Sequence, residues 1–315
     1  MAVKHEIAEN PSCENDAARR FTADTNPFLR LPGMALEKLH DGMSWSEGPC
    51  YVPALDTLIF SDIPNNRMLQ WVPELGVRVL SHNSHYSNGI TLDNQGRILT
   101  CCHRTHSVLR FESDAGETIL ASRYNDKPLN SPNDVVVSRD GAIWFTDPSY
   151  GILSHYEGER RDSEQEACRV YRVAPDTLEI SAVSSDLTMP NGLAFSPDEK
   201  TLYVADSSRS HFTTGSRSLF SFDVSTDGQL SNCREFFEIE HGVPDGLAVD
   251  ELGNVWCSSA RGVEIIDPSG NWLDYVPVPE VVSNLTFGGP KNNRLFITAT
   301  SGLYSIYVGV KGASF

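Results

Sequence analysis

Short apolar runs alternate with turn residues along most of this chain, a pattern typical of β-strands joined by tight turns. The clearest pair of runs is Val135–Val137 and Ile143–Phe145, which flank the turn Arg139-Asp140-Gly141. The polar pair Asn133-Asp134 stands where the first of these strands begins. We therefore predict a β-hairpin with polar side chains at the start of its first strand.

The same unit recurs along the chain. Each copy opens with a polar residue, continues through an apolar run, turns, and returns through a second apolar run. The opening residues, called openers here, are Glu47, Asn88, Asn133, Asn191, Asp245 and Asn284. Their separations of 41, 45, 58, 54 and 39 residues are typical of repeats that each form a small four-stranded sheet. The sequence thus predicts an all-β fold, a six-bladed β-propeller.

One domain accounts for nearly the whole chain. The propeller is expected to span residues 33–315, and the polar residues 1–32 are expected to form a tail or a cap. Apolar alternation resumes at Ala35–Trp45, which predicts an outer strand that pairs with the last blade and closes the ring. The longest insertion, Pro148–Gln165, is expected to line the mouth of a site or to carry an interface.

The openers are the candidate functional residues. Taken singly, an Asn or Asp before Gly is better explained as a turn dipeptide. In a propeller, however, the equivalent ends of all innermost strands lie on one face around the axis, so six openers at one phase would converge there. Glu47, Asn133, Asn191 and Asp245 would offer two carboxylates and two amides. This donor set suits Ca²⁺, although other divalent cations are possible, and the absence of His and Cys disfavours zinc.

Composition narrows the possible partners and location. The formal charge is −17, from 42 acidic and 25 basic residues. This charge disfavours nucleic acid and membrane surfaces as binding partners and favours cations. An acidic surface is also an ordinary route to solubility. The seven cysteines show no Cys-x-x-Cys spacing, so reduced thiols in a cytoplasmic protein are the simplest expectation. No apolar segment resembles a secretion signal or a membrane span.

Other catalytic signatures are absent from the sequence. It contains no Gly-x-Ser-x-Gly, His-Glu-x-x-His, P-loop or Gly-x-Gly-x-x-Gly motif. A cation with open coordination positions polarises a carbonyl or phosphoryl oxygen and lowers the pKa of a bound water. The openers therefore favour metal-dependent hydrolysis.

Several motifs occur in a consistent order from about residue 35 to the C-terminus: Trp45-Ser-Glu-Gly-Pro49, Leu129–Val137, Trp144–Pro148 with Tyr150-Gly151, Pro190–Leu193, Pro244–Leu247 and Phe287-Gly-Gly289. With these motifs the chain resembles the gluconolactonase and senescence-marker-protein-30 (SMP-30, regucalcin) family, especially its longer microbial branch. The resemblance implies that Glu47, Asn133, Asn191 and Asp245 are metal ligands, most often for calcium. It also implies a sugar lactone substrate, such as D-glucono-1,5-lactone, and a role in carbohydrate metabolism.

The mechanistic hypothesis assigns the remaining roles. Asp245, a ligand with a second oxygen free, is the first candidate for general base and Asp134 the second. Strand alternation turns Asp134 to the opposite face of the blade from Asn133, so a role in holding a ligand is the stronger alternative for Asp134. Candidate substrate contacts are Asn88, His103, Ser131, Tyr150 and Asn284.

The roles of His103 and Ser131 as substrate contacts have specific alternatives. His103 occupies the position at which other repeats carry Asp62, Asp147 and Asp206. It is equally explained by a hydrogen bond that fixes the end of its blade. At Ser131, animal members of the family carry a substrate-binding arginine, so their sugar contacts cannot be copied. Two alternatives for the function stay open. One is a Ca²⁺-dependent esterase or phosphotriesterase that uses the same site, and the other is a non-catalytic propeller that binds a partner with this face and uses the metal only to stabilise its fold.

Overall fold

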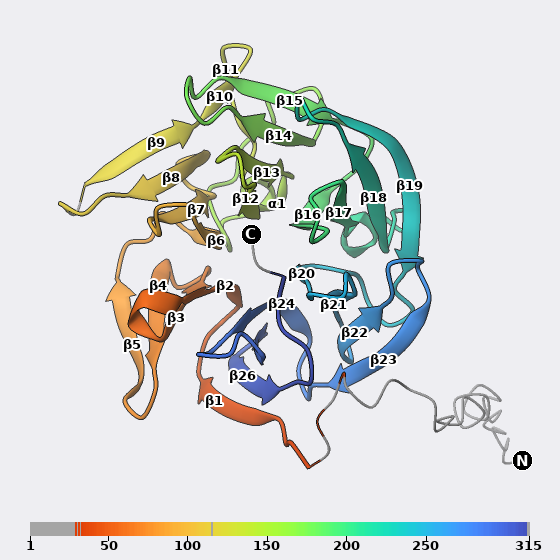
Figure 1. Ribbon diagram of the computed structural model, residues 1–315. Helices are drawn as coiled ribbons and strands as arrows, with labels where there is room; N and C mark the ends of the chain where they lie inside the picture. Colours follow the sequence, from red (N-terminus) through yellow and green to blue (C-terminus); the bar gives the residue numbers. More distant parts are fainter. Residues whose placement is uncertain (1–28, 30, 32, 115, 314–315) are drawn as a thin grey trace, which may run out of the picture.

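The computed structural model describes residues 29, 31, 33–114 and 116–313. Within this part, six four-stranded antiparallel sheets are arranged in a ring around a central axis (Figure 1). The prediction of a six-bladed β-propeller is confirmed. Most of the tail or cap predicted at residues 1–32 lies outside the described residues, and that assignment stays a prediction. Leu29 is buried in a cluster with Trp256 and Val308. No helix in the described part of the chain is long and apolar enough to cross a membrane.

The strands of each blade follow one another in sequence from the axis outward, except in the last blade. The first three blades are β2 (Ser46–Val52), β3 (Thr57–Asp62), β4 (Arg67–Val72) and β5 (Gly76–Ser81); β6 (Ser87–Leu92), β7 (Ile98–Cys102), β8 (Ser107–Phe111) and β9 (Glu117–Ala121); and β12 (Val135–Val137), β13 (Ile143–Asp147), β14 (Arg169–Val173) and β15 (Ile180–Ser184).

The other three blades complete the ring. They are β16 (Pro190–Phe195), β17 (Thr201–Asp206), β18 (Ser218–Val224) and β19 (Leu230–Glu238); β20 (Leu247–Val249), β21 (Val255–Ser259), β22 (Gly262–Ile266) and β23 (Trp272–Pro277); and β24 (Val282–Gly288), β25 (Arg294–Ala299), β26 (Gly302–Tyr307) and β1 (Glu37–Asp41). A short hairpin, β10 (Arg123–Tyr124) with β11 (Lys127–Pro128), and one helical turn, α1 (Tyr150–Leu153), lie in the connections.

The ring is closed as predicted. Strand β1 pairs antiparallel with β26, with Glu37 opposite Ser305 and Asp41 opposite Gly302. The strand is shorter than the expected Ala35–Trp45. This pairing joins an N-terminal strand to the last blade. It covers the outer edge of β26 and closes the ring.

Apolar side chains fill the space between neighbouring blades. The predicted hairpin is present, with Val136 opposite Trp144, and its turn glycine Gly141 has a φ of 86°. Trp144 packs edge-on against Phe195 of the next blade, with ring centroids 5.4 Å apart. Because each blade buries both of its faces against neighbours, the hydrophobic effect holds the blades together as one unit.

The aspartates at the ends of three second strands bind main-chain N–H groups of the segment that enters the same blade. Asp62 accepts from Ser44 at 3.0 Å and Asp206 from Thr188 at 2.9 Å. Asp147 accepts from Asn130 at 2.9 Å. These three side chains therefore fasten the entry segment of a blade to its second strand, which is a structural role.

Asp147 gives a prediction for stability. Its Oδ1 is buried without a hydrogen-bond partner, and burial raises its pKa from 3.8 to about 7. The folded state therefore binds a proton on Asp147 more tightly than the unfolded state does. The contribution of Asp147 to the free energy of unfolding then falls as pH rises from about 4 to 7. Asp147→Asn keeps the acceptor without the charge, and we expect it to be more stable than wild type by roughly 1–4 kcal/mol at pH 8 but not at pH 4. Urea unfolding at both pH values measures the difference, and an equal difference at both would contradict the prediction.

Candidate metal and active site

The openers lie at the axis, at the starts of the innermost strands. Glu47, Asn88 and Asn191 lie within β2, β6 and β16, while Asn133 and Asp245 lie two residues before β12 and β20. All five line one cavity of about 540 Å³ at this end of the axis. The fold thus brings together side chains that are far apart in the sequence.

Hydrogen bonds join each blade to the next at this level and form an unbroken circle around the axis. The acceptors are the main-chain carbonyls of the openers or of their neighbours. In blade order the bonds are Ser61 Oγ to Asn88 O, Gly89 N to Asn133 O, Thr146 Oγ1 to Asn191 O, Gly192 N to Asp245 O, Gly246 N to Ser283 O and Ser283 Oγ to Ser46 O. The backbone beneath the cavity is therefore held by long-range contacts.

The glycines that follow the openers are explained by this close approach. A Cβ on Gly89 would lie 2.4 Å from Asp134 Oδ1 and 2.6 Å from Asn133 O. A Cβ on Gly246 would lie 2.0 Å from the Asn284 carboxamide. These dipeptides belong to the hub of the propeller and not to turns, because only glycine leaves room for the next blade.

The circle also corrects the phase of the sixth opener. The bond from Gly246 N to Ser283 O repeats the bonds from Gly89 N to Asn133 O and from Gly192 N to Asp245 O, so Ser283 and not Asn284 is equivalent to Asn133 and Asp245. Asn284 is one residue further along, at the phase of Asp134. Because side chains alternate along a strand, a shift of one residue turns a side chain to the other side.

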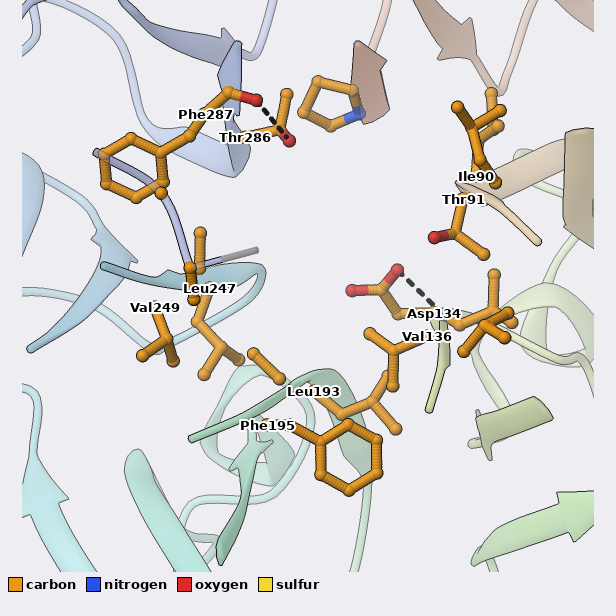
Figure 2. Close-up of a pocket in the computed structure, with 18 of the residues that line it drawn as sticks. Ile90, Thr91, Asp134, Val136, Leu193, Phe195, Leu247, Val249, Thr286 and Phe287 are labelled. Carbon is orange, nitrogen blue, oxygen red and sulfur yellow. Dashed lines mark hydrogen bonds between the residues drawn. The ribbon is translucent and has the colours of Figure 1, made fainter. Parts of the chain in front are cut away.

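Asn284 and Asp134 accordingly face the other end of the axis, where they line a second cavity of about 450 Å³. Figure 2 shows Asp134 pointing into this cavity among apolar side chains that include Val136, Leu193 and Leu247. Asn284 Nδ2 donates to Glu47 Oε2 at 2.9 Å and lies 3.5 Å from Asp134 Oδ2. Asp134 therefore reaches the first cavity only through Asn284 and Glu47.

Buried carboxyl groups dominate the electrostatics of the first cavity. Burial raises the pKa of Glu47 well above its usual range, and the negative charges of Asp245 and Asp134 raise it further. The pKa of Asp245 is raised in the same way by burial and by Glu157 and Asp134. Burial also raises the pKa of Glu157 to about 7 and that of Asp134 to about 6. No lysine or arginine is among the described residues that line this cavity.

These residues fit a hard divalent cation. Glu47, Asn133, Asn191 and Asp245 present two carboxylates and two carboxamides to one cavity, and oxygen donors of these kinds suit calcium. A cation there would offset the repulsion between the buried carboxylates. The described residues contain no group of three or more His, Cys, Asp and Glu side chains placed to hold a metal, so any such site here depends on the two amides.

His103 and Ser131, both predicted to contact substrate, are fully buried and do not line the cavity. His103 Nδ1 donates to Glu157 O at 2.9 Å, so its Nε2 accepts from Asn88 Nδ2 at 3.2 Å. Burial lowers its pKa to about 4, which keeps the ring neutral. Ser131 Oγ donates to Pro148 O and accepts from Gly151 N. The two side chains hold Asn88 and the insertion in place.

The insertion after β13 lies over the cavity and adds residues to it. Tyr150 lines the cavity, and its buried hydroxyl lies beside the hydroxyls of Ser207 and Ser210 without a hydrogen bond of normal geometry. Its ring contacts His211, with centroids 5.4 Å apart. Glu157 also lines the cavity, and sequence reasoning missed Glu157 and His211. The length of the insertion pointed to the mouth of a site, but no motif marked Glu157. His211 lies in a different connection, between β17 and β18, and no motif marked it either.

Fold and cavity define a six-bladed propeller with a buried acidic site on its axis. The family model for the SMP-30/Gluconolactonase/LRE-like region matches residues 45–301, and the chain belongs to this family. A gluconolactonase from Zymomonas mobilis is 32% identical over 284 residues, covering 84% of this chain and 79% of the relative. A regucalcin from Xenopus laevis is 27% identical over 289 residues, covering 84% and 92%.

Solved structures agree with this assignment. A gluconolactonase from Xanthomonas campestris is 39% identical, with a TM-score of 0.83 and coverage of 89% of this chain and 91% of that one. A putative gluconolactonase is 36% identical, with a TM-score of 0.85 and coverage of 91% and 96%. These relatives support lactone hydrolysis, and we assign the chain to the lactonase class of enzymes.

Proposed function

We propose that this enzyme is a calcium-dependent lactonase that opens a sugar lactone, such as D-glucono-1,5-lactone, by attack of water on the ring carbonyl. The observation that carries the proposal is the convergence of Glu47, Asn133, Asn191 and Asp245 on one cavity. The names of the Zymomonas and Xanthomonas relatives support the choice of substrate.

The four side chains would hold the cation by their oxygens. When bound, calcium would supply Lewis-acid chemistry, polarising the lactone carbonyl and stabilising the negative charge that develops on it. The inter-blade hydrogen bonds hold the backbone at Asn133, Asn191 and Asp245, so the donors are positioned before any ligand enters.

Asp245 is the proposed general base. It is the more accessible of the two carboxylates in the donor set, since Glu47 is 3% exposed and its Oε2 already accepts from Gly48 N and Asn284 Nδ2. Asp245 N is bound to Ser258 Oγ at 2.8 Å, which fixes the backbone beneath its side chain. Asp134 remains the second candidate, but its position favours a role in orienting Asn284 and Glu47.

Asn88 and Tyr150 are the proposed direct substrate contacts, since both line the cavity. The other three predicted contacts would affect the substrate only indirectly, by positioning residues that line the cavity. They are His103, Ser131 and Asn284.

Replacing Tyr150 with phenylalanine is expected to raise KM for a polyhydroxy lactone. The Tyr150 hydroxyl makes no hydrogen bond of normal geometry with its neighbours Ser207 and Ser210, and a substrate hydroxyl would supply one. A neutral hydrogen bond of this kind corresponds to roughly a two- to tenfold change in KM. Tyr171 offers a matched control, because its buried hydroxyl also has no partner but lies outside the cavity. If Tyr171→Phe raised KM as much as Tyr150→Phe, Tyr150 would not be a substrate contact.

The proposed function is tested by pH-stat hydrolysis of a panel with and without added Ca²⁺. The panel contains D-glucono-1,5-lactone, unsubstituted lactones, aryl esters and a phosphotriester. We expect calcium-dependent turnover of lactones at the highest kcat/KM. A preference for aryl esters or the phosphotriester would contradict the proposal and favour the esterase alternative.

A further inference from the structure

The first cavity has two chemically different parts. Its floor carries the oxygen donors, while its mouth carries three large apolar side chains that are unusually exposed. They are Leu153 at 45%, Tyr156 at 55% and Val281 at 45% exposure, and we call them the apolar collar.

The apolar collar comes from opposite sides of the ring. Leu153 and Tyr156 belong to the insertion that follows β13 in the third blade, and Val281 directly precedes β24 in the sixth (Figure 1). The wall between collar and floor is also apolar where Ile63 and Val282 line it, each 1% exposed. Apolar side chains therefore also stand behind the cavity wall below the mouth, while the exposed apolar surface is that of the collar.

A free sugar lactone uses only part of such a site. Its hydroxyl groups need polar partners, which the floor offers in Asn88, Tyr150 and Glu157. A cavity of about 540 Å³ lies within the range that holds ligands larger than one six-membered ring. With such a substrate bound, the apolar collar would remain exposed to water. Hydration of apolar surface is unfavourable, so a substrate that covers the collar would gain binding free energy.

We infer that the site accepts lactones that carry an apolar substituent on the ring, an alkyl, acyl or aryl group, and prefers them to the bare ring. The lactone lies on the floor and the substituent packs against the apolar collar. The inference rests on the proposed lactone hydrolysis and adds the class of substituent. Anionic substituents are disfavoured, because Glu47, Asp245 and Glu157 face the cavity and its described lining residues include no lysine or arginine.

Single exposed apolar residues occur on most protein surfaces and need no explanation. Leu75 and Leu252, at 85% and 57% exposure, are examples in this chain and line neither axial cavity. The collar differs because its three members border one cavity together with the donor set. Leu252 therefore provides a matched control.

The test measures kcat/KM for a series of δ-lactones with lengthening alkyl chains, from δ-valerolactone to δ-dodecalactone. Burial of a methylene group against the collar is expected to raise kcat/KM about two- to fourfold for each carbon until the collar is filled. The double variant Leu153→Ser, Val281→Ser is expected to lower the ratio of δ-decalactone to δ-valerolactone at least tenfold. Leu252→Ser should leave that ratio at the wild-type value, and circular dichroism checks that each variant is folded.

The results separate the inference from the proposed function. A flat dependence on chain length, with δ-valerolactone still hydrolysed, would overturn the inference and leave lactone hydrolysis standing. Failure to hydrolyse any lactone with Ca²⁺ present would overturn both. A concentration-dependent dimer in size-exclusion chromatography that the collar variant abolishes would assign the collar to a second copy of this chain, and that result would also overturn the inference.

Discussion

Replacing Asp245 with asparagine is expected to lower kcat by about 10²–10⁴-fold, the usual cost of removing a general base. Asparagine keeps the size of the side chain and one oxygen donor but cannot take a proton from water. The inter-blade bond from Gly192 N to Asp245 O is made by the backbone and should survive. The measurement is kcat at saturating lactone and calcium, with calcium affinity from titration calorimetry and folding from circular dichroism.

Asp134→Asn serves as the comparison for Asp245→Asn. Asp134 lines the opposite cavity and touches the donor set only through Asn284, so its loss should lower kcat less than about tenfold. Near wild-type kcat in Asp245→Asn with calcium bound would remove Asp245 from the mechanism. A large loss in Asp134→Asn alone would give the role of base to Asp134.

Removal of calcium with a chelator is expected to lower turnover at least about 100-fold while the protein stays folded at the assay temperature. No lysine or arginine is among the described lining residues of the cavity, so charge stabilisation in the reaction depends on the cation. The blades are joined by apolar packing and by inter-blade hydrogen bonds that need no metal. Because the cation binds the folded state, its removal should still lower the melting temperature.

Calcium added back should restore turnover better than magnesium or zinc, since the donors are carboxylates and amides from four blades. Glu47→Gln removes one of the two carboxylates of the donor set and should raise the calcium concentration needed for half-maximal rate. Full activity in the chelator would end the calcium proposal. Unfolding that accompanies the loss of activity would instead support a metal that only pins the fold.

Much of this protein was predictable because the relevant signals are local. Apolar alternation and turn residues specify single strands, and their repetition at similar spacing specifies the number of blades. The closing strand followed from the same alternation, and it pairs with β26 as expected. The oxygen-bearing openers also repeat along the sequence, so their convergence on the axis followed from the symmetry of the fold.

Only the tertiary structure decided which way each opener points. Asn191 and Asn284 have the same side chain, yet Asn191 lines the first cavity and Asn284 the second, because the register between blades shifts Asn284 by one residue. The insertion likewise placed Tyr150 and Glu157 over the donors through bonds to His103 and Ser131, which are distant in sequence. The sequence by itself determined the repeats and the donor types, since these depend on neighbouring residues. The direction of each side chain depended on contacts between blades, which no local pattern records.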